Sequence, residues 1–121
     1  MTQEHKELLL QDLCARLPYG VKCKYYDCCE GEYNEGKICG FERKEYIQID
    51  GVCIHIEEVK PYLFPLSSMT EEQRTSHNFL KHSAYANPIK LIDWYNKNHF
   101  DFRGLIPKNL AINAFGLNIY N

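Results

Sequence analysis

One stretch in the middle of the chain alternates apolar and polar side chains on both sides of an Asp-Gly pair. Residues 45–56 read E-Y-I-Q-I-D-G-V-C-I-H-I. Asp50-Gly51 between two β-rich runs is typical of a type I′ turn, which needs positive φ at both central residues. A two-residue loop also sets the register, so that Tyr46 pairs with His55. The pattern predicts a hairpin with a dry face and a semi-polar face: Ile47, Ile49, Val52, Ile54 and Ile56 form the first, and Tyr46, Gln48, Cys53 and His55 the second.

The pattern before the hairpin predicts one helix and two strands. Thr2 can cap a helix that runs to about residue 17 and ends at Pro18 and Gly20. Its apolar stripe has three- and four-residue spacing and consists of Leu9, Leu10, Leu13, Cys14 and Leu17. Alternation over 21–26 predicts a strand that buries Val21, Cys23 and Tyr25. Residues 27–36 are polar and predict a loop, and 37–43 predict a second strand with a bulge at Gly40.

The character of the sequence changes after Val59. Residues 60–69 hold two prolines among apolar side chains, which predicts an extended connection lying across the sheet rather than a helix. Thr70 to Gln73 form a capping box, which predicts a helix to about Tyr85. Further helices are predicted over 89–97, after the Asn-Pro pair at 87–88, and over 107–114, with a turn or short strand at 99–104.

Together these elements predict a single α+β domain over residues 1–121. The expected architecture is an N-terminal helix, a small bent antiparallel sheet or partly open barrel of 4–5 strands, and C-terminal helices packed on it. A helix-plus-sheet layer covers about 1–60, the connection covers 61–70, and a helical layer covers about 71–121.

Composition and charge narrow the function classes. With 45% hydrophobic and 25% charged residues, the 121-residue chain is ordinary for a globular protein. It has no long apolar run and a polar N-terminus, so we expect a cytoplasmic protein without a membrane segment, whose six cysteines stay reduced. A net charge of −2 argues against binding to duplex DNA. Residues 1–60 carry the acidic excess and residues 61–121 a slight basic excess.

Three segments carry a resemblance to a known family. They are D-L-C-A-R-L-P-Y-G-V-K at 12–22, V-K-P-Y-L-F-P-L-S-S-M-T at 59–70 and N-H-F-D-F-R-G-L-I-P at 98–107. In this order, over nearly the full length, they resemble a family of short proteins of Bacteroidales genomes, their prophages and phages. The chain departs from that family at Phe64, where arginine is favoured, and in its tail. The resemblance implies a phage or mobile-element setting and brings no established activity.

Several groups of reactive side chains are weak candidates for chemistry. Cys23, Cys28, Cys29 and Cys39 lie close in sequence, but their spacing differs from that of the usual zinc sites, so free cysteines are favoured and no metal or other cofactor is predicted. Cys53 and His55 share a strand face without an evident orienting acid, which favours a structural histidine. The phosphate-loop, dinucleotide, zincin and hydrolase motifs are absent.

Aromatic residues suggest a ligand site instead. Most of the nine Tyr, six Phe and one Trp should pack in the core. Tyr62, Trp94 and Tyr95, beside the basic Arg103, could form a stacking and cation–π pocket for a nucleotide-like ligand.

The sequence therefore favours a non-enzymatic binding protein. Its expected partner is a host protein or a small ligand, and one alternative is a sponge that sequesters a nucleotide immune signal as a counter-defence. The rival from another class is a small nucleotide hydrolase using His55 or His99. A homodimer is a further expectation, since a small sheet leaves unpaired edges.

Overall fold

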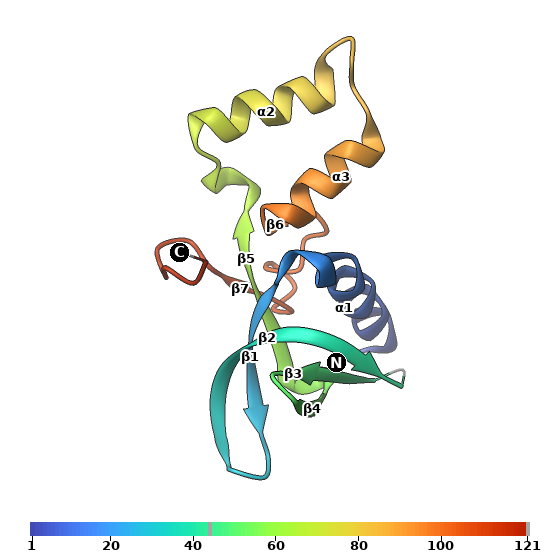
Figure 1. Cartoon of the computed structure of the whole chain (residues 1–121), viewed down its shortest axis with the longest axis vertical. Coiled ribbons are helices and arrows are strands. Elements are labelled where there is room, and N and C mark those ends of the chain that lie inside the picture. Colours follow the sequence, from blue (N-terminus) through green and yellow to red (C-terminus); the bar gives the residue numbers. More distant parts are fainter. Residues whose placement is uncertain (44, 121) are drawn as a thin grey trace.

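The computed structural model describes residues 1–43 and 45–120 and confirms the α+β class (Figure 1). Its sheet is mixed and open rather than purely antiparallel. The helices are α1 (Gln3–Arg16), α2 (Glu71–His82) and α3 (Pro88–Lys97). The strands are β1 (Lys22–Asp27), β2 (Glu32–Glu42), β3 (Tyr46–Ile49), β4 (Val52–His55), β5 (Val59–Pro65), β6 (Phe100–Asp101) and β7 (Ile112–Asn113). None of the helices in the described part of the chain has both the length and the apolar character to cross a bilayer.

The central hairpin forms as the sequence predicts. β3 and β4 pair antiparallel, with Tyr46 opposite His55 and Ile49 opposite Val52. Asp50 and Gly51 have φ of 47° and 85°, which is the positive-φ geometry of a type I′ turn. The predicted dry face is buried except at Val52 beside the turn, which is 37% exposed.

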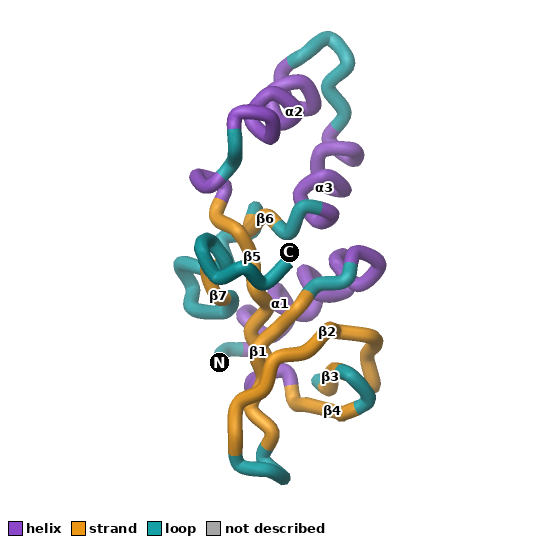
Figure 2. Tube along the Cα trace, turned by 60° about the vertical axis from the view of Figure 1, so that its left-hand side comes forward, coloured by secondary structure: helices purple, strands orange, loops and turns teal. Residues whose placement is uncertain are grey.

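β5 is the largest correction to the predicted fold. The strands follow the order β4-β3-β2-β1-β5-β6, and β7 also pairs with β5 (Figure 2). The segment is extended as predicted, but its first half is an internal strand of the sheet and not a connection lying across it. Prolines tolerate extended backbone, and β5 buries Val59 and 61–63, which explains why this segment is so apolar.

The first half of β2 was predicted as loop, and that prediction is wrong. β2 begins at Glu32 and pairs with β1 from Asp27 opposite Glu32 to Lys22 opposite Lys37. This end of the hairpin projects with its side chains largely exposed, so no apolar alternation marks it in the sequence. The predicted bulge is confirmed, because the register shifts between Ile38 and Gly40.

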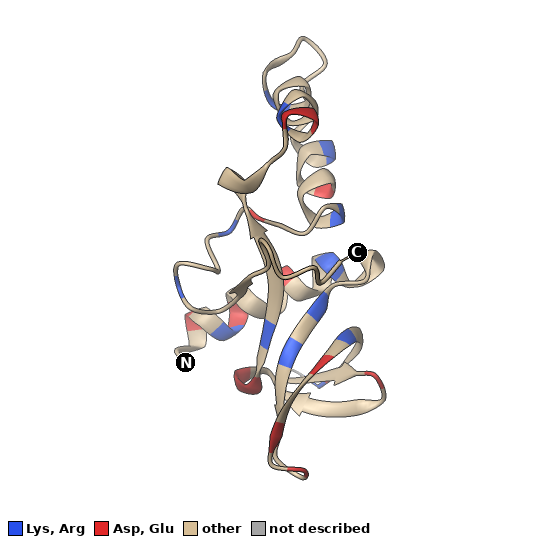
Figure 3. Ribbon diagram, turned by 90° about the vertical axis from the view of Figure 1, so that its left-hand side faces the viewer, with Lys and Arg blue, Asp and Glu red and all other residues tan. Residues whose placement is uncertain are grey.

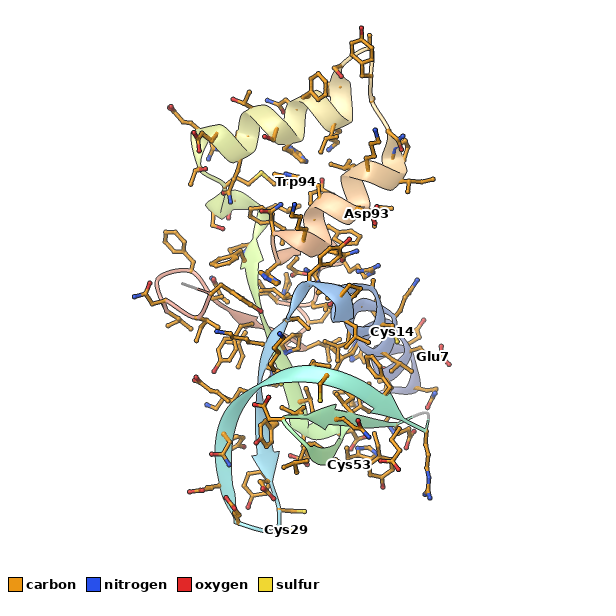
Figure 4. The ribbon with its side chains drawn as sticks, in the orientation of Figure 1. Glu7, Cys14, Cys29, Cys53, Asp93 and Trp94 are labelled. Carbon is orange, nitrogen blue, oxygen red and sulfur yellow. The ribbon has the colours of Figure 1, made fainter. Side chains whose placement is uncertain are left out.

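α1 starts at its predicted cap, Thr2, but its buried face differs from the predicted stripe. Cys14 is exposed (Figure 4), whereas Asp12 and Arg16 are 0% exposed. Asp12 accepts hydrogen bonds from Arg16 Nε at 2.8 Å and from Arg103 Nη1 at 2.7 Å. This pairing lets two charges occupy the helix–sheet interface beside Leu13.

The C-terminal third holds two helices rather than three. α2 and α3 begin where predicted, although α2 ends at His82 rather than Tyr85. The predicted helix over 107–114 is wrong, because this segment forms turns and β7. The Asp101 carboxylate accepts the backbone N–H groups of Leu105 and Ile106, both at 2.8 Å, so a side chain orders the segment instead of helical hydrogen bonds.

Candidate binding surface on the helical arm

α2, α3 and the turn between them form an arm that extends from the sheet (Figures 1 and 2). At the base of the arm, α2 follows β5 and the short 3-10 helix η3 (Leu66–Ser68), and α3 leads into β6. A small hydrophobic cluster fills this base, separate from the main core. It consists of buried Met69, Tyr95 and Phe100, with Phe64, Leu91, Trp94 and Phe102 partly buried around them.

Local sequence signals start both helices of the arm. Thr70 Oγ1 accepts the Gln73 N–H at 3.2 Å, and Gln73 Oε1 accepts the Thr70 N–H at 2.8 Å, which completes the predicted capping box. Asn87 Oδ1 accepts the N–H groups of Ile89 and Lys90 at 3.0 and 3.2 Å. The helices are therefore specified by their caps, even where little of their surface is buried.

His77 joins the two helices through one polar contact and two ring contacts, and its ring centroid lies 5.5 Å from that of Tyr95. The Nε2 atom of His77 on α2 lies 2.6 Å from the Tyr95 hydroxyl on α3. The His77 ring also lies 5.9 Å from that of Trp94, which Figure 4 places on the side of α3 toward α2. Burial, with the nearby positive charges of Lys81 and His82, lowers the pKa of His77. A neutral His77 therefore holds the arm together at neutral pH.

The outer end of the arm exposes large apolar side chains. No residue of α2 is buried. Phe79 on α2 is 54% exposed, Tyr85 in the turn 78%, and Ile89 and Ile92 on α3 73% and 42%. We call these four residues the arm tip. The Phe79 and Tyr85 rings stack with centroids 6.2 Å apart, so they present a joined aromatic surface rather than separate side chains.

Hydrogen bonds order the turn that carries the arm tip. Tyr85 N–H donates to Ser83 Oγ at 3.1 Å, and Ala86 N–H donates to the Ser83 carbonyl at 3.0 Å. The Asn87 N–H donates to the Leu80 carbonyl at 3.2 Å, which ties the turn back to α2. The arm tip is thus held in place before any partner binds, which lowers the entropic cost of binding.

Two lysines lie within the segment that carries the arm tip, and one acid, Asp93, directly follows Ile92. Residues 78–92 contain Lys81, Lys90 and His82, and no aspartate or glutamate. The acids of the arm lie in the first turn of α2 and at Asp93. An apolar surface with a basic rim complements a partner that is apolar and acidic.

Three of the four predicted ligand residues come together at the base of the arm. Phe102 stacks on Tyr95 with centroids 4.9 Å apart, and the Arg103 guanidinium carbon lies 4.2 Å from the Phe102 ring centroid. Trp94 meets Tyr95 edge to face at 5.8 Å. Arg103 is also paired with buried Asp12, and Tyr95 is only 7% exposed. These groups pack on one another, so they connect the arm to α1 and the sheet and do not form an open pocket.

Tyr62, the fourth predicted ligand residue, has different neighbours. Its hydroxyl donates to Glu35 Oε1 at 2.8 Å, and its carbonyl oxygen accepts from the Tyr120 hydroxyl at 2.7 Å. Burial and the Glu35 carboxylate raise its pKa to about 12. It lines a cleft of about 460 Å³ that includes Lys22 and Asp50. The pocket of four residues stays a prediction.

His55 has an orienting acid that the sequence reading did not find. Its Nδ1 atom accepts the Glu57 N–H at 3.2 Å, so the hydrogen is on Nε2, which donates to Glu45 Oε2 at 3.2 Å. Lys6 bridges Glu45 and Glu57 at 3.4 and 3.1 Å. Glu45 and Lys6 line a cleft of about 670 Å³ beside α1. Because both His55 nitrogens are engaged, this network has the geometry of a structural clamp between α1 and the hairpin.

The cysteines are spread over the molecule. Cys23 is buried, while Cys28 and Cys29 lie between β1 and β2. Figure 4 shows Cys29 at this turn. Desolvation and Glu42 raise the pKa of Cys53, which disfavours its thiolate. Within the described residues, no three His, Cys, Asp or Glu side chains are grouped to hold a metal ion.

His99, the other histidine considered for a hydrolase, packs against the Tyr120 ring and lies near two positive charges. Its ring stacks on Tyr120 with centroids 3.8 Å apart. Burial, with the charges of Arg16 and Lys22, lowers its pKa to about 4. His99 is thus neutral at physiological pH and is covered by the C-terminal tail.

The arm tip itself was not identified from the sequence. The sequence pattern predicted helices here, and it assigned no role to Phe79, Tyr85 or Ile89. The available signal was a run of large apolar residues around a predicted turn, in a segment without acids.

Comparison of the chain with protein-family models, with curated proteins and with solved structures finds no match.

Proposed function

We propose that this protein acts by binding another protein, and that the arm tip carries the binding surface. The observation that carries the proposal is that α2 has no buried residue and that large apolar side chains are exposed at the outer end of the arm. These are Phe79 on α2, Tyr85 in the turn and Ile89 on α3. Exposed apolar side chains gathered on an ordered projection are typical of interaction sites. Their contact with a partner would remove this surface from water.

The chemistry of the arm tip specifies a class of partner. Two stacked aromatic rings and two isoleucines fit an apolar patch, and Lys81 and Lys90 fit carboxylates around it. The resemblance to phage and mobile-element proteins makes a host protein the expected source of such a patch. Binding of this kind needs no catalytic residue.

Capture of a small nucleotide has less support. Tyr95, Phe102 and Arg103 stack on one another, so a base would have to displace existing contacts to stack there. A hydrolase has less support still, because both nitrogens of His55 are engaged and His99 is covered by Tyr120.

The test compares partner capture by three tagged chains expressed in the host cell. The test variant is Phe79→Ser/Tyr85→Ser/Ile89→Ser, and the control is Phe115→Ser/Leu117→Ser, which removes exposed apolar side chains from the tail. We expect a protein to co-purify with the wild type and the control and to be lost from the arm variant, with all three chains folded by circular dichroism. Equal capture by all three chains would contradict the proposal.

A further inference from the structure

The end of the β1–β2 hairpin has the chemistry that the arm tip requires. Residues 25–36 carry three exposed acids, Glu30, Glu32 and Glu35, and no lysine or arginine, while Asp27 is only 8% exposed. Figure 3 shows acidic residues at this end of the molecule. Tyr33 beside them is 65% exposed. We call residues 27–35 the hairpin end, and it offers an exposed aromatic ring among carboxylates.

The carboxylates of the hairpin end are crowded. The pKa of Glu30 is raised, first by its hydrogen bond with Glu32 and then by the negative charges of Asp27 and Glu32. Like charges this close repel one another, and a positively charged surface placed over them would relieve the repulsion. The hairpin end is therefore complementary in charge to Lys81 and Lys90.

Tyr33 of the hairpin end already accepts a cation. Tyr26 and Tyr33 pack edge to face with centroids 5.1 Å apart. Lys24 Nζ lies 4.9 Å from the Tyr33 ring centroid. The ring thus already holds one ammonium group of its own chain, and its 65% exposure leaves much of its surface open to a partner.

These two surfaces lie at opposite ends of the molecule. Figure 1 is drawn with the longest axis vertical, and it shows the α2–α3 turn at the top and the β1–β2 turn at the bottom. The arm tip and the hairpin end of one chain are too far apart to contact each other. Any contact between them therefore joins two copies of the chain.

We infer that the arm tip of one copy binds the hairpin end of a second copy, head to tail. The inference deepens the proposed function and rests on it, because it names a partner for the same surface. A head-to-tail contact uses two different surfaces, so each added copy leaves both kinds of surface free at the ends, and the assembly is an open chain rather than the closed dimer expected from the sequence.

The size and charge of the surfaces predict how the assembly behaves. Two projections this small bury less than the roughly 1,600 Å² of a standard interface, so the contact is weak and assembly requires high protein concentration. Exposed charges are screened by salt, so the mean assembly size falls as ionic strength rises.

The test measures assembly size by sedimentation velocity from low micromolar to near-millimolar protein, at low salt. The variants are Lys81→Glu/Lys90→Glu on the arm and Glu30→Lys/Glu32→Lys on the hairpin end. The control, Lys97→Glu/Lys108→Glu, makes the same net charge change as the arm variant outside the arm tip, at the end of α3 and in the segment after β6.

We expect the wild type and the control to assemble with increasing concentration and each test variant to remain monomeric. An equimolar mixture of the two variants should assemble again, because its reversed surfaces complement each other. A monomeric wild type at every concentration would overturn the inference, as would assembly of the arm variant alone or a mixture that stays monomeric.

The inference and the proposed function fail in distinguishable ways. If the wild type is monomeric but the arm variant loses a co-purifying host protein, the arm binds a different partner and only the self-association is wrong. If partner capture and assembly are both unchanged by arm substitutions, the arm tip is not a binding surface.

Discussion

α1 and α2 are helices of similar length that begin with the same kind of cap, yet they use their side chains in opposite ways. Thr2 caps α1 and Thr70 caps α2, and both helices carry acids in the first turn. α1 buries apolar and charged side chains alike against the sheet, whereas α2 buries none. The local sequence forms both helices, and only their surroundings decide whether a helix stabilises the fold or remains available to a partner.

The same contrast separates the body, formed by α1 and the sheet, from the arm. In the body, one continuous cluster joins α1 to β1–β5. In the arm, a small cluster at the base and the His77–Tyr95 contact hold two helices whose outer end is exposed. Substitutions in the body should therefore change stability, and those at the arm tip should change binding.

The largest expected effect comes from Asp12→Ala in the body. It would leave Arg16, which is 0% exposed, without its ion partner. Uncompensated buried charge costs about 3–5 kcal/mol of unfolding free energy. Urea denaturation followed by circular dichroism measures the loss. Glu7→Ala, on the exposed side of the same helix, is the control and should change stability by less than about 0.5 kcal/mol. Equal effects would show that the Asp12 network does not support the fold.

A pair of leucine truncations compares the two regions directly. Leu13→Ala removes a fully buried side chain of the body and should cost about 2–5 kcal/mol. Leu80→Ala removes a partly buried side chain of α2 and should cost about 1 kcal/mol. Chemical denaturation of both variants tests the comparison. A larger loss from Leu80→Ala would mean that the arm is an integral part of the core.

His99, which packs against the C-terminal tail, should make the stability of the fold sensitive to acid. Its pKa is about 4 in the folded protein, below the ordinary value of 6.5, so the unfolded chain binds more protons between these values. The contribution of His99 to the free energy of unfolding is therefore present in full above about pH 6.5. It is lost as pH falls toward 4, and the loss is roughly 2–3 kcal/mol.

Denaturation at a series of pH values measures this dependence in the wild type and in His99→Gln. The slope between pH 6.5 and 4 should be smaller in the variant. Identical slopes in the wild type and His99→Gln would show that the histidine is not held neutral.

The smallest expected change in stability is at the arm tip. Phe79→Ser/Ile89→Ser removes two side chains that are 54% and 73% exposed, so the unfolding free energy should change by less than about 0.5 kcal/mol. The same variant should lose partner binding. A stability loss above about 2 kcal/mol would mean that these residues support the fold, which would remove the contrast between arm and body.

The parts of the fold that could be predicted from sequence are those specified by neighbouring residues. Asp50-Gly51 sets the register of β3 and β4, and the capping box at Thr70 starts α2. β5 was missed because its prolines favour a connection as much as a strand, and the hairpin end was missed because exposed strands lack apolar alternation.

The parts that could not be predicted depend on residues far apart in sequence. Asp12 pairs with Arg103 across 91 positions, so the burial of a carboxylate on α1 has no local signal. Glu45 lies 10 positions from His55, where the sequence reading found no orienting acid. The arm tip is exposed because no other element packs over the outer end of α2 in the described part of the chain. This depends on the tertiary structure and has no signal in the local sequence.

The most direct test of the arm as a binding surface places a photo-crosslinking amino acid at position 79 in living host cells. Position 115, where the side chain is 67% exposed compared with 54% at position 79, is the matched control away from the arm. We expect crosslinking at 79 to give discrete adducts with a partner or a second copy, and crosslinking at 115 to give none. No adduct at 79, or the same adducts at both positions, would contradict the account.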